Sequence, residues 1–167
     1  MSDMKKLIYI AIILLSACKV TYNTRSVTDA DFTVYYNCEL KCADSVTYVA
    51  TERNLKTKFP RLLSFKPSPY KCQQATNKDY LHSGYDKGHL SPARLFRYNK
   101  KARQKSNYYD NVCPQTPSFN RGIWKRTENT EVKLIEQYGK VRTKIIPIIN
   151  EPYYFIGNGV CVPDSFI

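Results

Sequence analysis

The chain has 167 residues, of which 43% are hydrophobic and 13% aromatic, which suits one globular domain and argues against disorder. Its formal net charge of +12 attracts polyanions, so nucleic acid, an anionic membrane surface and acidic polysaccharide are all compatible partners. Charge alone does not choose among them, and it does not exclude a basic surface that has no partner.

The first segment, residues 1–17, is predicted to be an export signal. Lys5 and Lys6 precede the apolar run Leu7–Leu15, which is shorter than the roughly 20 residues that span a bilayer but fits a signal-peptide core. The sequence LSAC at 15–18 resembles the bacterial lipobox, which implies cleavage before Cys18 and a lipid anchor on that residue. An ordinary signal peptide cleaved after Ala17 is the alternative. We therefore expect an exported protein, either anchored in the cell envelope or secreted.

The next segment, residues 18–31, is polar and lacks apolar periodicity. It is predicted to be a tether between the membrane and the folded domain. No internal repeat or low-complexity block follows, so residues 32–167 are expected to form that domain.

Five cysteines follow Cys18, namely Cys38, Cys42, Cys72, Cys113 and Cys161. An oxidising compartment makes disulfides plausible, and Cys38 with Cys42 is the easiest pair because it closes a small loop. A zinc site is disfavoured because no second cysteine pair has matching spacing. The odd number leaves at least one thiol free or paired between chains.

Helices and strands are both predicted in the domain. Val46–Thr51 is β-branched and aromatic, as strands are, and Asn120–Tyr138 is the clearest helix, with Gly139 at the usual C-cap position. The other predicted elements are a long loop at 59–78, a basic helix at Phe96–Tyr108, and strands at Lys144–Ile149 and Tyr153–Ile156. Strands before and after a central helix indicate an α+β fold.

The segment from Tyr80 to Ala93 carries side chains suited to phosphate chemistry. His89 follows Gly88, which we expect to let the backbone turn sharply and expose the imidazole. Histidine can accept a proton near neutral pH, and Lys87 adds a positive charge for a phosphate. A histidine that caps a backbone group in a turn is the plainer explanation when this segment is taken alone.

Asn120, Trp124 and Glu128 are four residues apart and share one face of the predicted helix, because each step of four drifts by only about 40°. An amide oxygen at Asn120 and a carboxylate at Glu128 could hold a magnesium ion, which takes oxygen ligands and keeps several waters. Each residue also has a plainer explanation: Asn120 as a helix cap, Trp124 as core, and Glu128 as a surface pair with Lys125.

Taken together, these residues resemble the DNA/RNA non-specific endonucleases of the ββα-metal (His-metal finger) superfamily. The matching motifs are Asp86-x-Gly88-His89-Leu90-x-Pro92-Ala93, Asn111-x-x-Pro114-Gln115 and Asn120-x3-Trp124-x3-Glu128. Further matches are Arg61-x3-Phe65, Ser83-Gly84-Tyr85 and Val162-Pro163-x2-Phe166. The resemblance covers roughly residues 32–167. It implies an α+β fold with a ββα-metal finger core, a mixed or antiparallel sheet and a long helix that bears the metal.

The resemblance also implies a role for each matching residue. His89 would be the general base that deprotonates the attacking water, and Arg61 would contact the phosphate. Asn120 would be the one direct protein ligand of Mg²⁺, or of another divalent cation such as Mn²⁺, and Glu128 would orient a water of that ion. The implied nucleic-acid contacts are Lys87, Arg94 and Gln115. The implied function is sequence-non-specific hydrolysis of DNA and RNA to 5′-phosphate products.

Two departures from the family pattern bear on function. Lys87 stands where the family has arginine, which keeps the charge but loses the bidentate fork. The chain also stops at Ile167, just after the Val-Pro-x-x-Phe segment, where such enzymes normally continue, so a truncated sheet edge is possible. The alternative function is therefore a catalytically weakened lipoprotein that binds nucleic acid. The intact His89, Asn120 and Glu128 count against it, because binding alone needs none of them.

Overall fold

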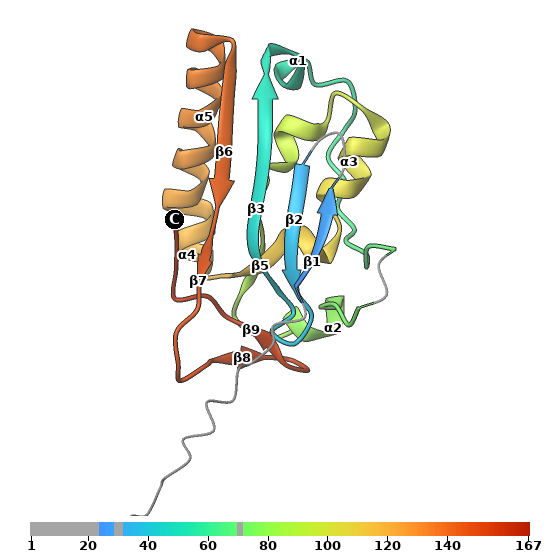
Figure 1. Cartoon of the computed structure of the whole chain (residues 1–167), viewed down its shortest axis with the longest axis vertical. Helices are drawn as coiled ribbons and strands as arrows, with labels where there is room; N and C mark the ends of the chain where they lie inside the picture. Colours follow the sequence, from blue (N-terminus) through green and yellow to red (C-terminus); the bar gives the residue numbers. More distant parts are fainter. Residues whose placement is uncertain (1–23, 29–31, 70–71) are drawn as a thin grey trace, which may run out of the picture.

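The structure is a computed structural model that describes residues 24–28, 32–69 and 72–167 (Figure 1). The predicted signal segment and Cys18 lie outside the described residues. The strands are β1 (Thr24–Thr28), β2 (Phe32–Asn37), β3 (Cys42–Thr51), β4 (Asp86–His89), β5 (Val112–Gln115), β6 (Lys140–Ile145), β7 (Pro147–Ile148), β8 (Phe155–Ile156), β9 (Val160–Cys161) and β10 (Ser165–Phe166). The helices are α1 (Glu52–Leu55), α2 (Asn77–Tyr80), η1 (Ala93–Phe96), α3 (Lys100–Ser106), η2 (Tyr109–Asn111), α4 (Pro117–Phe119), η3 (Asn120–Trp124) and α5 (Lys125–Tyr138). None of the helices described is long and apolar enough to cross a membrane.

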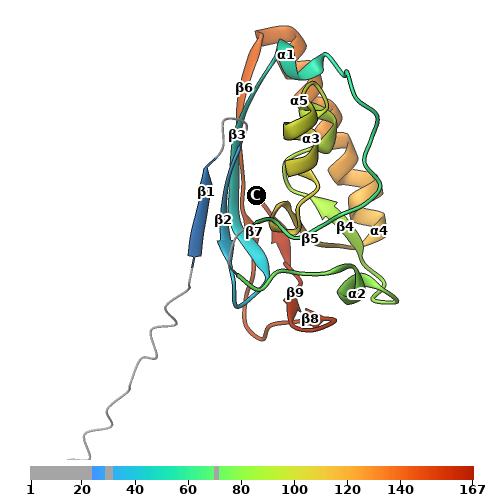
Figure 2. The same cartoon turned by 90° about the vertical axis from the view of Figure 1, so that its right-hand side faces the viewer.

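A four-stranded antiparallel sheet in the order β1-β2-β3-β6 forms one layer of the molecule. Alternate residues of a strand point to opposite faces, and in β2 the buried set includes Phe32 and Val34. In β3 the buried set includes Val46, Tyr48 and Ala50. Figure 2 shows that α3 and α5 lie on the same side of the sheet, so the main core fills the space between two layers.

The long helix α5 packs its apolar face on the sheet through Val132 and Ile135, both of which are buried. It ends at the predicted residue, because Gly139 adopts a left-handed φ of 73° and its backbone N–H donates to the Ile135 carbonyl at 2.8 Å. The predicted helix at 120–138 begins with a π-helical turn, η3, before the α-helix starts at Lys125. Such turns are often found at functional sites.

The hairpin of β4 and β5 lies in the helical layer and leads through α4 and η3 into α5 (Figure 2). The antiparallel pairing of His89 with Val112 and of Asp86 with Gln115 sets its register. Two antiparallel strands followed by a long helix form the predicted ββα unit, and the α+β fold class is confirmed.

Gly88 does not form the sharp turn that we expected from the sequence. It lies within β4, and its φ is not among the positive values found at other glycines such as Gly84. Glycine is needed there for space, because a Cβ at this position would overlap the Gln115 side chain. The backbone of β4 therefore runs close over Gln115 and brings His89 to the end of an extended strand.

Several predicted boundaries differ from those in the structure. Thr24–Thr28, which we assigned to the tether, pairs with β2 as the edge strand β1, and its β-branched residues suit that conformation. The helix predicted at 96–108 shrinks to α3, because the Asn99 side chain caps it by accepting from the N–H groups of Lys101 and Ala102. The strand predicted at 144–149 divides into β6, which begins at Lys140, and β7, which pairs with β10.

Cys38 and Cys42, the pair that looked easiest from the sequence, are not bonded to each other. Cys38 is bonded to Cys72, and Cys42 is bonded to Cys113, while Cys161 is a buried free thiol. Cys42 is a fully buried strand residue whose side chain enters the core, and packing of the β4–β5 hairpin against the sheet brings Cys113 to it. Tertiary packing decided the pairing, and the odd thiol predicted from the count is Cys161.

Candidate active site

An open pocket of about 1480 Å³, including its mouth, lies between the β4 strand, the start of the long helix and the loop that follows α1. Its acidic side chains are Asp86 and Glu128, and His89 also lines it. The basic residues that line it are Arg61, Lys87, Arg94, Arg97, Arg121 and Lys125. This excess of positive charge suits a polyanion, and the structure brings most of the predicted site residues together here.

Several contacts hold His89 at the end of β4. Its backbone carbonyl accepts a hydrogen bond from the indole N–H of Trp124 at 2.9 Å, and the Phe65 ring lies 5.1 Å from the imidazole between centroids. Burial lowers the pKa of His89 to about 4; the Asn107 hydrogen bond opposes this shift and the positive charge of Arg61 adds to it. The imidazole is therefore neutral at neutral pH, which is the form that a general base needs.

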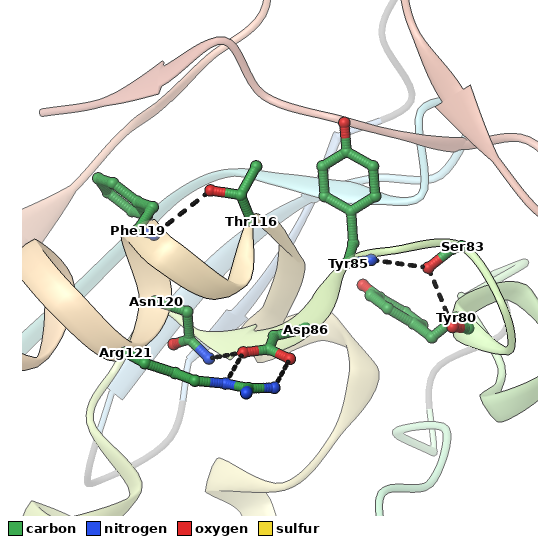
Figure 3. Close-up of polar contacts among 8 residues, drawn as sticks. All are labelled: Tyr80, Ser83, Tyr85, Asp86, Thr116, Phe119, Asn120 and Arg121. Carbon is green, nitrogen blue, oxygen red and sulfur yellow. Dashed lines mark hydrogen bonds and ion pairs between the residues drawn. The ribbon is translucent and has the colours of Figure 1, made fainter.

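A clamp of two side chains, Asp86 and Arg121, fixes the amide of Asn120, as Figure 3 shows. The Asn120 amide nitrogen donates to Asp86 Oδ2 at 2.9 Å, and Arg121 donates to both Asp86 oxygens at 2.8 and 2.7 Å. Hydrogen bonding to Arg121, the largest contribution, lowers the pKa of Asp86, so this carboxylate stays charged. Because Asp86 binds the amide nitrogen, the Asn120 oxygen points away from the clamp and is available as an acceptor.

Glu128 lies in the same pocket, and its pKa is raised above the ordinary value of a glutamate. Burial, followed by the nearby Glu131, raises its pKa to about 7, while Arg61 and Arg94 act in the opposite direction. Glu131 is itself held by hydrogen bonds from Tyr48 and Thr143. A carboxylate that is costly to ionise is a common mark of a functional site, and a cation in the pocket would offset that cost.

The donor set fits a hard divalent cation. In the described ranges, no cluster of three or more His, Cys, Asp or Glu side chains could hold a metal ion. The pocket instead offers the neutral oxygen of Asn120 and the carboxylate of Glu128, both oxygen ligands. Mg²⁺ accepts such a sparse set because it keeps several waters and readily shares phosphate oxygens.

The predicted nucleic-acid contacts divide into two groups. Lys87 and Arg94 line the pocket, and the Lys87 ammonium also lies 5.2 Å from the Phe65 ring centroid and donates to the Asn77 side chain. Gln115 is 2% exposed and does not line the pocket. The structure gives Gln115 a packing role against Gly88 in place of the predicted contact with nucleic acid.

Sequence reasoning missed the parts that hold the site together. Asp86 and Arg121 form the clamp on Asn120, and Asn107 contacts the imidazole of His89. The clamp could have been suspected from the sequence, because Arg121 follows Asn120 directly. Nothing in the sequence connects Asn107 with His89, because Asn107 lies 18 residues further along the chain, at the end of α3. Trp124 is core, as its plainer explanation held, although its indole also supports His89.

The chain is similar in sequence to known mitochondrial nucleases. Human mitochondrial Endonuclease G is 38% identical over 110 residues, which cover 59% of this chain and 37% of that protein. Mitochondrial Nuclease 1 of Schizosaccharomyces pombe is 36% identical over 106 residues, which cover 56% of this chain and 33% of that protein. The chain thus spans just over a third of the human relative.

A crystal structure of the EndoG/EndoGI complex superposes with a TM-score of 0.68 at 25% identity, covering 84% of this chain and 64% of that chain. The family model described as DNA/RNA non-specific endonuclease matches residues 16–167, which is nearly the whole sequence. The fold, the site geometry and this match together place the chain in the DNA/RNA non-specific endonuclease family.

Proposed function

We propose that this chain is a metal-dependent endonuclease that hydrolyses phosphodiester bonds of DNA and RNA without regard to sequence. The observation that carries the proposal is the grouping of His89, Asn120 and Glu128 in one pocket rimmed with positive charge. A protein that only binds nucleic acid has no need for a buried neutral imidazole beside two oxygen donors. Family membership and the relatives named nucleases support the same function.

Asn120 would be the one direct protein ligand of a Mg²⁺ or Mn²⁺ ion, and the Glu128 carboxylate would orient a water of that ion. When bound, this cation would act as a Lewis acid that stabilises negative charge on the leaving 3′ oxygen. The chain contributes by fixing the Asn120 amide through Asp86 and Arg121, so that the donor oxygen is presented without a loss of side-chain entropy on binding.

The chain's own residues supply the rest of the reaction. His89 takes a proton from a water molecule as the water oxygen attacks phosphorus, and the bond from phosphorus to the 3′ oxygen breaks. Arg61 lies close enough to His89 and Glu128 to affect the pKa of both, so its guanidinium can neutralise the charge that develops on the phosphate. Lys87 and Arg94 would bind the phosphates on either side. The products would carry 5′-phosphates.

Digestion of plasmid DNA and of single-stranded RNA by the purified chain tests the proposal. With Mg²⁺ we expect both to be cut into a broad distribution of fragments, and EDTA to stop cleavage until Mg²⁺ is restored. Cleavage that persists in EDTA would refute the metal dependence, and one discrete product from a long duplex would refute the lack of sequence preference.

Export and a lipid anchor at Cys18 form part of the proposal and rest on the sequence of residues 1–18 alone. Lipidation would hold the enzyme at the envelope, where incoming nucleic acid could meet the basic pocket, and stable anchoring needs more than one acyl chain. Intact-mass spectrometry of the membrane fraction should find a lipidated Cys18 at the mature N-terminus, and Cys18→Ser should abolish it. An unlipidated wild-type protein in the soluble exported fraction would reject the anchor and leave the nuclease proposal unaffected.

A further inference from the structure

Asn107 lies directly behind the imidazole of His89, at the C-terminal end of α3. Its side chain is almost completely buried, with 2% of the residue exposed. Its amide nitrogen donates to the backbone carbonyl oxygens of Leu62 at 3.2 Å and Ser64 at 3.1 Å. Its amide oxygen lies 3.3 Å from Nε2 of His89. Three segments that are distant in sequence therefore meet at one side chain.

These contacts leave little freedom in the proton positions. A carbonyl oxygen can only accept, so the two carbonyls of the 62–64 loop require the NH₂ side of the Asn107 amide. The amide oxygen, which also only accepts, is then the atom that faces His89. A neutral imidazole has one N–H, and the ring can satisfy this contact only by placing that hydrogen on Nε2.

We propose that Asn107 is a positioning residue that holds neutral His89 in its Nε2–H tautomer, so that Nδ1 carries the lone pair that accepts the proton. The catalytic consequence rests on the proposed nuclease function, whereas the tautomer itself is a property of the protein without substrate. The supporting bonds make the arrangement rigid, since the indole of Trp124 fixes the His89 backbone from the other side.

The same residue also couples the base to the loop that carries the phosphate-binding arginine. Leu62 and Ser64, the carbonyl partners of Asn107, lie between Arg61 and Phe65 in sequence. The Asn107 backbone carbonyl accepts a further bond from the N–H of Lys66 at 3.3 Å. Loss of the Asn107 side chain should therefore misplace Arg61 as well as His89, and the two effects can be separated by choice of variant.

Long-range proton–nitrogen NMR correlation of the histidine-labelled full chain tests the tautomer. The chain has only two histidines, His82 and His89, and exposed His82 provides an internal reference for an unconstrained ring. At neutral pH the wild-type spectrum should show His89 protonated at Nε2 alone. Asn107→Leu should give a mixture of tautomers, as at His82. Asn107→Asp should keep the Nε2–H tautomer, because a carboxylate still accepts that hydrogen.

Kinetics of the same variants give the second measurement. We expect Asn107→Leu to lower kcat by about tenfold or more, since misdirecting a general base forfeits part of its roughly 10²–10⁴-fold contribution. Asn107→Asp cannot donate to the Leu62 and Ser64 carbonyls, so it should raise KM through the Arg61 loop with a smaller loss in kcat. Asn99→Ala is the matched control, because it removes the N-cap of the same helix without touching His89.

The outcomes separate the two proposals. If the wild-type chain with Mg²⁺ leaves nucleic acid intact, the proposed nuclease function fails, and the NMR spectra still decide the tautomer. If the chain cuts but His89 carries its hydrogen on Nδ1, the role of Asn107 is refuted. A folded Asn107→Leu variant with the wild-type tautomer and kcat would also refute it, as would an equal loss of kcat in Asn99→Ala.

Discussion

The two histidines differ in surroundings more than in chemistry. His89 is buried against Phe65 at the end of β4, whereas His82 is exposed in a turn with a positive φ of 56°. We expect His89→Ala to lower the rate of plasmid cleavage by about 10²–10⁴-fold, the usual contribution of a general base. His82→Asn is the control, because asparagine tolerates a left-handed backbone, and it should stay within about twofold of wild type. Activity of His89→Ala within threefold of wild type would remove His89 from the mechanism.

Glu128 should set the pH dependence of cleavage. Burial raises the pKa of Glu128 to about 7, whereas burial lowers that of His89 to about 4. His89 is thus already a base throughout the neutral range, and the Glu128 carboxylate forms only as pH rises through about 7. Because a bound cation would favour the carboxylate, we expect kcat/KM to rise over that range at subsaturating Mg²⁺, and we expect Glu128→Gln to lower the plateau and flatten the rise. If kcat/KM of the wild type instead rises around pH 4, the group that controls the rise is His89.

The raised pKa of Glu128 should make the folded protein less stable over the pH range in which cleavage becomes faster. Between its ordinary pKa of 4.5 and about 7, Glu128 binds a proton in the folded state that the unfolded chain has released. The free energy of unfolding therefore falls as pH rises through that window. Glu128→Gln removes the buried charge, so above pH 7 it should raise Tm by the equivalent of about 1–2 kcal/mol after allowing for solvent in the open pocket. Its loss of activity would then not reflect unfolding.

At the scale of elements, the disulfides join parts that the chain order separates. The bond between Cys42 and Cys113 joins residues 71 positions apart and links strand β3 to β5. Strand β5 pairs with β4, which carries His89 and other residues of the candidate site. The bond between Cys38 and Cys72 anchors the loop that includes Arg61. Both therefore support the pocket from outside it.

Removing the longer crosslink should lower stability substantially. A loop of this length corresponds to about 4 kcal/mol of chain entropy, so Cys42→Ser with Cys113→Ser should unfold at much lower urea concentration. Cys161→Ala, at the buried free thiol, is the control and should change the midpoint far less. Equal urea midpoints for the double variant and the wild type would show that packing alone holds the hairpin to the sheet.

At the scale of the whole molecule, we expect the positive charge to govern how the proposed nucleic-acid substrate binds. Six basic side chains line the pocket, and phosphate contacts of this kind position a strand without reading its bases. If about three phosphates are neutralised, counterion release weakens binding roughly 40-fold between about 50 and 200 mM salt. We expect KM to rise accordingly while kcat changes little.

A charge variant inside the pocket and one outside it make this prediction specific. Arg94→Ala should reduce the slope of log KM against log salt by about one phosphate contact. Lys133→Ala removes an exposed lysine of α5 that does not line the pocket, and it should leave the slope unchanged. Equal slopes for all three proteins would exclude Arg94 from phosphate binding.

The fold class and the family could be predicted from the sequence, and the same motifs named the side chains that we propose carry the chemistry. The β-branched and aromatic residues of Val46–Thr51 located the second half of β3, and the helix predicted to end before Gly139 is α5, which ends there. The ordered motifs around His89, Asn120 and Glu128 named three residues that the structure brings into one pocket. These features could be predicted because backbone propensity and motif spacing are local properties of the chain.

How those side chains are held could not be predicted from the sequence, because it depends on contacts between distant segments. The partner of Cys42, the burial of Gln115, the Asp86–Arg121 clamp and the contact of Asn107 with His89 all join segments that are distant in sequence. The need for glycine at position 88 likewise came from the approach of Gln115 across the hairpin, and no turn was involved. Such contacts depend on how the elements pack in three dimensions. A motif or a local residue pattern gives no information about which distant segments will meet.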